Sequence, residues 1–256
     1  MSRAKSLTIV VLLALPIGAC AAVAEPPSPA ATDEVALRRS GESIIVFQAG
    51  ADFSGDLPNA PWRVVADAPP EGGFALSDLG GRGALRIDAS RGALLVRPVH
   101  VPLAAAPKLR WAWYLEPSHF GGGAGLGLDR GLRVEIGISD GAPSSWFPTG
   151  DFPAHARRVD IALAGVGAPN AALASHSLYA VSDKGVRRTL AAATGDAAGR
   201  WRVEEVDLAA LHRALWPSVK VDGATIEYIA IGGMPGALPP GVPPTVGYIS
   251  EILLAR

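Results

Sequence analysis

The sequence predicts an all-β protein: a two-sheet antiparallel β-sandwich, jelly-roll or galactose-binding-like, with one short helix. Many short segments alternate apolar and polar residues with the period of two that half-buried strands show. The 256 residues include 30 glycines and 22 prolines, which interrupt these segments at short intervals. Long helical periodicities are scarce, so the pattern disfavours helical bundles and βαβ folds.

The N-terminus has the features of a bacterial lipoprotein signal. Arg3 and Lys5 precede the apolar run Leu7–Ile17, which is shorter than the ~20 residues of a membrane-spanning helix. The small residues before Cys20 resemble a lipobox, so we expect a signal peptide over residues 1–19 and lipidation of Cys20. The alternative is an ordinary signal peptide followed by a chance cysteine.

Lipidation predicts a location in the bacterial cell envelope. Several acyl chains, each worth about 0.8 kcal/mol per buried CH₂, would hold the protein on a membrane. The residue after Cys20 is Ala21 rather than aspartate. In lipoproteins of two-membrane bacteria this implies sorting to the outer membrane, and we expect the protein to face the periplasm. The Ala- and Pro-rich residues 20–41 are expected to be a tether. Cys20 is the chain's one cysteine, so no internal disulfide is expected.

Residues 42–256 are predicted to form a single domain, since neither an internal repeat nor a break in composition divides them. The expected strands are short apolar or alternating runs between turn residues: Ser43–Gln48, Trp62–Val65, Ala84–Ala89, Ala93–Val101, Lys108–Glu116, Leu132–Ser139, Arg158–Ala164, His176–Val181, Arg187–Ala191, Trp201–Val206, Thr225–Ile231 and Val246–Leu254. Pro98 predicts an edge strand or a bulge. Asp207 is expected to cap a helix over Leu208–Trp216.

The strand Lys108–Glu116 is expected to organise the core. Trp111 and Trp113 share one face with two leucines, so we assign both rings to the core rather than to a sugar-stacking platform. Arg110 and Tyr114 take the opposite face, where Tyr114 is the better candidate for stacking against a ligand.

Candidate ligand-binding residues follow from the charges of three predicted strands. The arginine and carboxylate side chains on their polar faces are Arg110 with Glu116, Arg133 with Glu135, and Arg158 with Asp160. Paired in register, they would form a lattice across one sheet surface, which suits sugar hydroxyls if that surface is concave. The alternative is a solvated face whose ion pairs contribute a few tenths of a kcal/mol each. The candidate binding residues are Arg110, Tyr114, Arg133, Glu135, Trp146, Arg158 and Asp160.

The predicted loops offer weaker candidates. Trp146 and Phe147 lie among serine, proline and glycine, where exposed rings contact a ligand or a partner unless they fold back onto the sandwich. A loop metal site could combine Asp151 and His155 with Asp129 or His119. Loop side chains four residues apart have no fixed geometry, so we predict no metal and no cofactor.

Several function classes are disfavoured by composition and motifs. The 23 basic and 24 acidic residues give a net charge of −1, so no basic stripe indicates nucleic-acid binding. The sequence contains no Gly-x-Ser-x-Gly elbow, His-Glu-x-x-His zinc motif, phosphate-binding loop or EF-hand. The glycines of Gly121–Gly127 do not have dinucleotide-binding spacing and favour a turning connection.

The order of several landmarks adds a family resemblance. In sequence they are Leu109-x-Trp111-x-Trp113, Gly150-Asp151-Phe152, Leu178-Tyr179, Gly199-Arg200-Trp201-x-x-Glu204, Asp207 with its helix, Ile226–Gly232 and Ile249–Leu254. Over residues 45–256 this order resembles a bacterial envelope family catalogued as domain of unknown function 3047. The resemblance implies the sandwich fold and brings no established activity. Gly150 stands where members tend to have a second acidic residue beside Asp151, so no role for an acidic pair carries over.

These observations support three hypotheses. The leading one is a non-catalytic, membrane-anchored envelope lipoprotein that binds a glycan or another envelope component. The second is a polysaccharide-active hydrolase or lyase on a jelly-roll scaffold, with Glu135 and Asp160 as the conceivable pair. Arg133 and Arg158 should keep both carboxylates ionised, which opposes a general-acid role. The third is a structural lipoprotein that docks an envelope protein through the loop aromatics.

Overall fold

A computed structural model describes residues 37–54, 57–58, 61–65, 73–89, 92–116, 132–140, 152–163, 174–181, 187–194, 199–233 and 246–256. The chain divides into two units, Met1–Glu34 and Val35–Arg256, and the description below concerns the second. Cys20 and the predicted signal peptide lie outside the described residues. Among the residues described, no helix is both long and apolar enough to cross a membrane.

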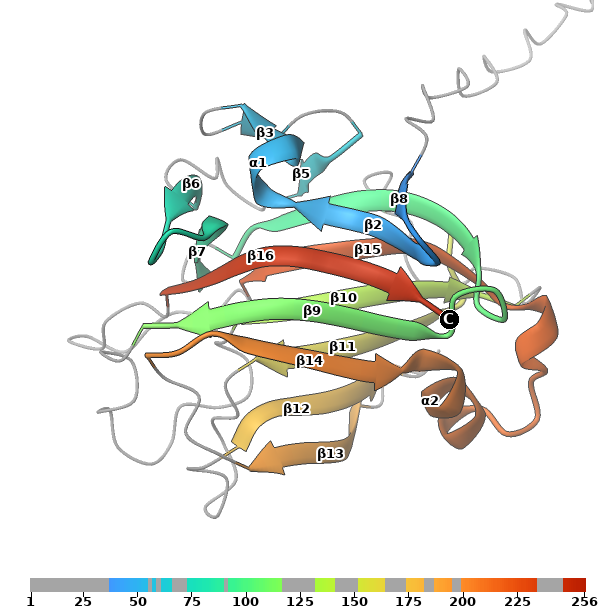
Figure 1. Cartoon of the computed structure of the whole chain (residues 1–256). Helices are drawn as coiled ribbons and strands as arrows, with labels where there is room; N and C mark the ends of the chain where they lie inside the picture. Colours follow the sequence, from blue (N-terminus) through green and yellow to red (C-terminus); the bar gives the residue numbers. More distant parts are fainter. Residues whose placement is uncertain are drawn as a thin grey trace, which may run out of the picture. The chain divides into compact units, whose positions relative to one another are not determined.

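Two antiparallel sheets make up the second unit (Figure 1). Sheet 1 contains β1 (Arg38–Ser40), β2 (Ser43–Gln48), β6 (Phe74–Asp78), β7 (Gly83–Asp88), β9 (Lys108–Leu115), β14 (Arg202–Asp207) and β16 (Val246–Ala255). Sheet 2 runs in the order β13 (Arg187–Thr194), β12 (Ala174–Val181), β11 (Arg157–Leu163), β10 (Leu132–Ser139), β15 (Thr225–Gly233), β8 (Leu94–Pro102) and β5 (Arg63–Val65). The smaller elements are α1 (Ala49–Asp52), β3 (Phe53–Ser54), β4 (Leu57–Pro58), α2 (Leu208–Leu215) and the 3₁₀ turn Val221–Gly223.

The core lies between the two sheets. In Figure 1, β16, β9 and β14 form one layer, and β15, β10 and β11 lie behind them. Trp111 and Trp113 of β9 are fully buried in one cluster with apolar residues of β10, β11 and β15. The predicted all-β sandwich and the assignment of both tryptophan rings to its core are confirmed.

Most predicted strands occur within a few residues of their expected bounds, and Ser43–Gln48 and Leu132–Ser139 match them fully. The expected helix forms as α2, and the Asp207 side chain accepts a hydrogen bond from the Ala210 backbone N–H at 2.7 Å. The elements absent from the prediction are short: β1, β3, β4, β6, the single turn α1 and the 3₁₀ turn Val221–Gly223. Such short segments contain too few residues to show a period of apolar and polar residues, so the conformation of these segments depends on long-range pairing.

A bulge in the centre of sheet 2 changes which face its residues take. Ile226 and Ile229 of β15 both point into the core, although three positions separate them. The pairing with both neighbours shifts register at Glu227, between Ile226 and Tyr228. Glu227 and Tyr228 therefore both lie on the outer face of the sheet, as a bulge allows. The shift lies opposite Pro98–Val101 of β8, so the bulge that Pro98 predicts is confirmed.

Candidate functional site

The six lattice residues do not share one surface. Arg110 and Glu116 belong with β9 in sheet 1, whereas Arg133, Glu135, Arg158 and Asp160 belong to β10 and β11 in sheet 2. The expectation of a single lattice is therefore wrong. Alternation reports which side of a strand is polar, but β9 pairs with β14 and β16 rather than with the next strand in sequence.

The outer face of sheet 2 carries a cluster that we call the polar band. It crosses β8, β15, β10 and β11, with one residue from the segment before β11: His100, Glu227, Tyr228, Arg133, Glu135, Ser139, Arg158, Asp160 and His155. Glu135 is 1% exposed and Asp160 is 2% exposed. The solvated face considered as the alternative does not describe this surface, because charged side chains are rarely so buried without fixed partners.

Ion pairs across β10 and β11 form the centre of the band. Glu135 and Asp160 are direct register partners. Arg133 lies 3.3 Å from a Glu135 carboxylate oxygen, and Arg158 lies 3.0 Å from Asp160 and 3.9 Å from Glu135. Burial lowers the pKa of Arg158, but the two carboxylates outweigh it and the net shift is upward. The four charges thus hold one another in place.

Tyr228 connects this centre to the bulge. Its hydroxyl donates to Glu135 at 2.7 Å. Burial, followed by the charge of Glu135, raises the pKa of Tyr228, so the phenol stays protonated. The ring occupies the space over Gly137, where any Cβ would overlap it. Glycine at this position is therefore required by the close approach of Tyr228.

His155 packs against the same ring. Its ring centroid lies 4.9 Å from that of Tyr228, and Phe152 approaches Tyr228 from the same segment at 5.3 Å. One His155 nitrogen lies 2.9 Å from the Pro153 carbonyl oxygen, to which it donates, and the other lies 3.4 Å from the Tyr228 hydroxyl. Burial lowers the pKa of His155, which favours the neutral ring. His155 therefore ties its segment to the sheet.

A second polar group lies at the other end of the bulge. His100 Nδ1 lies 2.7 Å from a Glu227 carboxylate oxygen, and the Ser139 hydroxyl donates to the other oxygen of that carboxylate. The His100 side chain is 51% exposed. Its φ of +45° is the one positive value at a non-glycine among the residues described. The bulge opposite Glu227 thus holds His100 in a backbone conformation that favours glycine.

Tyr114 and Arg110 lie on the outer face of sheet 1. The Tyr114 ring contacts Trp201 and Tyr248 at centroid distances of 5.9 and 5.8 Å, at interplanar angles of 52° and 76°. The Arg82 guanidinium lies 4.6 Å from the centre of the Trp201 ring. These rings are tilted against one another and form a small cluster rather than a flat platform. Arg110 is exposed farther along β9, opposite Glu205 and Leu253.

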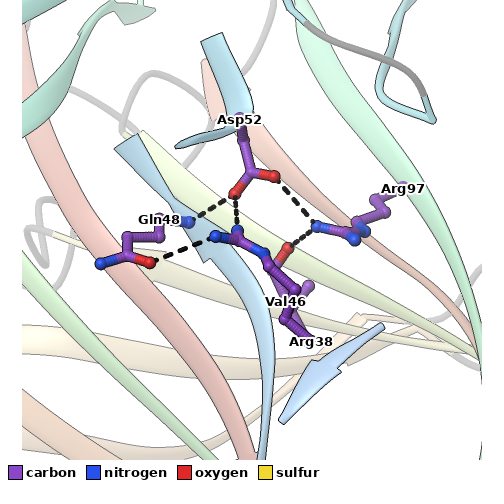
Figure 2. A network of polar contacts seen from close by, with 5 residues as sticks. All are labelled: Arg38, Val46, Gln48, Asp52 and Arg97. Atoms are coloured by element: carbon purple, nitrogen blue, oxygen red, sulfur yellow. Dashed lines mark hydrogen bonds and ion pairs between the residues drawn. The ribbon is translucent and has the colours of Figure 1, made fainter. Parts of the chain in front are cut away.

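A separate buried network supports the fold at the edge of the sandwich (Figure 2). Asp52 accepts from the Gln48 backbone N–H at 2.6 Å, from Arg38 at 2.9 Å and from Arg97 at 3.3 Å. Arg97 also donates to the Val46 carbonyl. Burial lowers the pKa of Arg97, with Asp52 opposing that shift. Each of these contacts joins parts of the scaffold, so we assign the network to stability.

The loop predictions have a different outcome. Trp146, Phe147, Asp151, Asp129 and His119 lie outside the described residues, so those predictions stay predictions. Within the described part of the chain, no group of three or more His, Cys, Asp or Glu side chains could hold a metal.

Sequence reasoning missed His100, Glu227 and Tyr228 as site residues. One signal was available: Glu227 is the single charge in an otherwise apolar segment. A lone charge in a central strand needs a partner, and here the bulge supplies the space for it. His100 gave no signal, because its position depends on the pairing of β8 with β15.

No family model and no curated protein matches the chain. TmCBM61 in complex with β-1,4-galactotriose is 14% identical, with 77% of this chain and 90% of that chain covered and a TM-score of 0.30. A family 29 carbohydrate-binding module with mannohexaose is 8% identical (83% and 90% covered, TM-score 0.33). LamA of Z. galactanivorans with laminaritriose and laminaritetraose is 13% identical (83% and 98% covered, TM-score 0.43). At these values the likenesses identify no function, so the proposal below rests on the polar band.

Proposed function

We propose that this protein is a non-catalytic, glycan-binding β-sandwich of the bacterial cell envelope, with the polar band as its binding site. The observation that carries the proposal is the fixed arginine–carboxylate–tyrosine network on the outer face of sheet 2. Sugar hydroxyls both donate and accept hydrogen bonds, and the network combines both kinds of group on one face, where the two arginines are its partly exposed members.

Pre-organisation supports the same assignment. The side chains of Arg133 and Arg158 are only 10% and 18% exposed, and each is held by a carboxylate. Binding a glycan to groups already held in place costs less conformational entropy than ordering free surface arginines. Phe152, which is half-buried against Tyr228, adds an apolar side chain next to the polar groups. Aromatic and polar groups together are typical of small-ligand sites.

The glycan proposal is tested by a glycan array followed by isothermal titration calorimetry. Arg158→Lys keeps the charge but loses the guanidinium fork, so we expect at least about a tenfold loss of affinity. Arg110→Ala is the matched control, because it removes an exposed arginine from the opposite sheet and should leave affinity unchanged. Binding lost in Arg110→Ala and kept in Arg158→Lys would move the site to sheet 1. Failure of every glycan to bind would remove the proposal.

The membrane part of the proposal rests on the lipobox before Cys20. We expect the wild-type protein to incorporate labelled palmitate and to fractionate with outer membranes. Cys20→Ser should lose the label and appear in the soluble fraction, while its folded domain keeps glycan affinity. An unlabelled wild-type protein, secreted in soluble form, would contradict lipidation and leave the ordinary signal peptide.

A polysaccharide-active enzyme is the second candidate, because Glu135 and Asp160 are direct cross-strand partners. The Cβ atoms of such pairs lie about 5 Å apart, so the two carboxyl groups can come near the ~5–5.5 Å separation that retaining glycosidases use. Two observations place this candidate second. Each carboxylate is engaged by an arginine, and Tyr228 is held protonated and fully buried. Release of reducing ends or unsaturated products from a bound polysaccharide would reverse the order.

A further inference from the structure

Each carboxylate of the polar band faces a basic side chain. Arg133 pairs with Glu135, Arg158 with Asp160, and His100 with Glu227. Arg63 of the edge strand β5 lies on the same face, opposite Val96. The described side chains of β5, β8, β15, β10 and β11 therefore place three arginines against three carboxylates there.

This balance bears on the charge of the ligand. A uronate, sulfate or phosphate group would have to compete with Glu135 and Asp160 for arginines that those carboxylates already hold. The three carboxylates also offset the attraction of the three arginines, so an anion gains no net electrostatic attraction from this face. A neutral sugar meets neither obstacle, since its hydroxyls can bind ion-paired groups through their remaining hydrogen-bonding positions.

His100 offers such a position at the exposed end of the band. A carboxylate can only accept, so in the neutral ring Nδ1–H donates to Glu227 and Nε2 is left as an acceptor. Ser139 donates to the second oxygen of Glu227 and so orients the carboxylate. The imidazole is thereby fixed, with its accepting nitrogen directed away from the carboxylate that holds the ring.

The backbone of His100 indicates that packing does not explain this residue. A φ of +45° favours glycine, yet this position holds histidine, a bulky residue whose side chain is half exposed. Strained non-glycine residues of this kind concentrate at ligand-binding and catalytic sites.

We propose that the polar band takes an uncharged glycan, and that one of its hydroxyls donates a hydrogen bond to Nε2 of His100. This inference rests on the proposed function and adds the ligand class and a contact. The glycan is recognised by its hydroxyl pattern, with no anionic group required.

The ligand class is tested with the full-length wild-type protein and two sets of polysaccharides. The neutral set is β-glucan, galactan and mannan, and the anionic set is alginate and polygalacturonate. We expect a neutral polymer to bind with an affinity that changes less than about twofold between about 50 and 500 mM NaCl. Binding of an anionic polymer with a steep loss in salt would overturn the inference and leave glycan binding standing. Binding of neither set would remove both.

The contact is tested by His100→Gly. Glycine accepts the positive φ, which offsets the lost contact with Glu227, so the melting temperature should change little, while affinity for the neutral glycan falls at least about tenfold. His100→Asn is the matched variant, because asparagine tolerates this backbone and keeps a polar side chain, so it should bind more tightly than His100→Gly. Wild-type affinity in His100→Gly, at unchanged or raised melting temperature, would show that the histidine makes no contact.

Discussion

Replacing Asp52 with alanine is expected to destabilise the folded protein by about 3–5 kcal/mol, the usual cost of removing one partner from a buried ion pair. Arg97 is 1% exposed and would lose its carboxylate. Its guanidinium is also held by the Val46 carbonyl and lies 5.7 Å from the Trp62 ring centre, so it cannot turn to water without breaking those contacts. The Gln48 N–H would lose its acceptor as well (Figure 2).

Urea denaturation of purified variants measures this effect, and the same network supplies the control. Arg38 also binds Asp52, but its side chain is 38% exposed, so Arg38→Ala should cost at most about 1 kcal/mol. The double variant Asp52→Leu with Arg97→Met removes both buried charges and should recover most of the lost stability. Equal losses in Asp52→Ala and Arg38→Ala would contradict the assignment of the network to buried-charge compensation.

Replacing Glu135 with alanine is expected to cost about 3 kcal/mol of stability and to abolish measurable glycan binding. Arg133 would lose its carboxylate, and the buried Tyr228 hydroxyl would keep only its longer contact with His155, at 3.4 Å. Asp160 would still hold Arg158, which keeps the expected cost at the lower end for a buried pair. Stability and glycan binding are both lost with this one residue because the same network of contacts supports both.

Glu135→Gln separates the two effects. The amide oxygen can still accept from Tyr228, so more stability should remain than in Glu135→Ala, whereas the lost charge frees Arg133 and should still weaken binding. Urea denaturation and calorimetry on the same preparations measure both quantities. If Glu135→Ala keeps wild-type affinity while the protein remains folded, the glycan site does not include the centre of the polar band.

Local residue patterns were sufficient to predict much of the fold. The alternation in Lys108–Glu116 was sufficient to place Trp111 and Trp113 inside, since period two separates the faces of any half-buried strand. Long strands and the Asp207-capped helix were predictable for the same reason: each has several residues that report one period or one cap. Short elements such as β1 and α1 lack that redundancy.

The candidate site depended on information that no local pattern contains. Arg133, Glu135, Arg158 and Asp160 were recognisable as charges on polar faces, but their separation from Arg110 follows from strand order, which is set by long-range pairing. The bulge that turns Glu227 and Tyr228 outward is likewise a property of three paired strands rather than of β15 alone.

The sequence by itself therefore determined the sandwich class, the face of each long strand and the buried rings of β9, because side-chain periodicity is a local property of the backbone. The predicted lipid anchor at Cys20 also comes from the sequence and awaits its test. Only the tertiary structure decided that Arg110 and Tyr114 lie on a different sheet from Arg133 and Glu135, and that His100, Glu227 and Tyr228 lie on the same face as these two. Those residues meet through pairing between distant segments, and a one-residue shift in register is enough to change the face that a side chain takes.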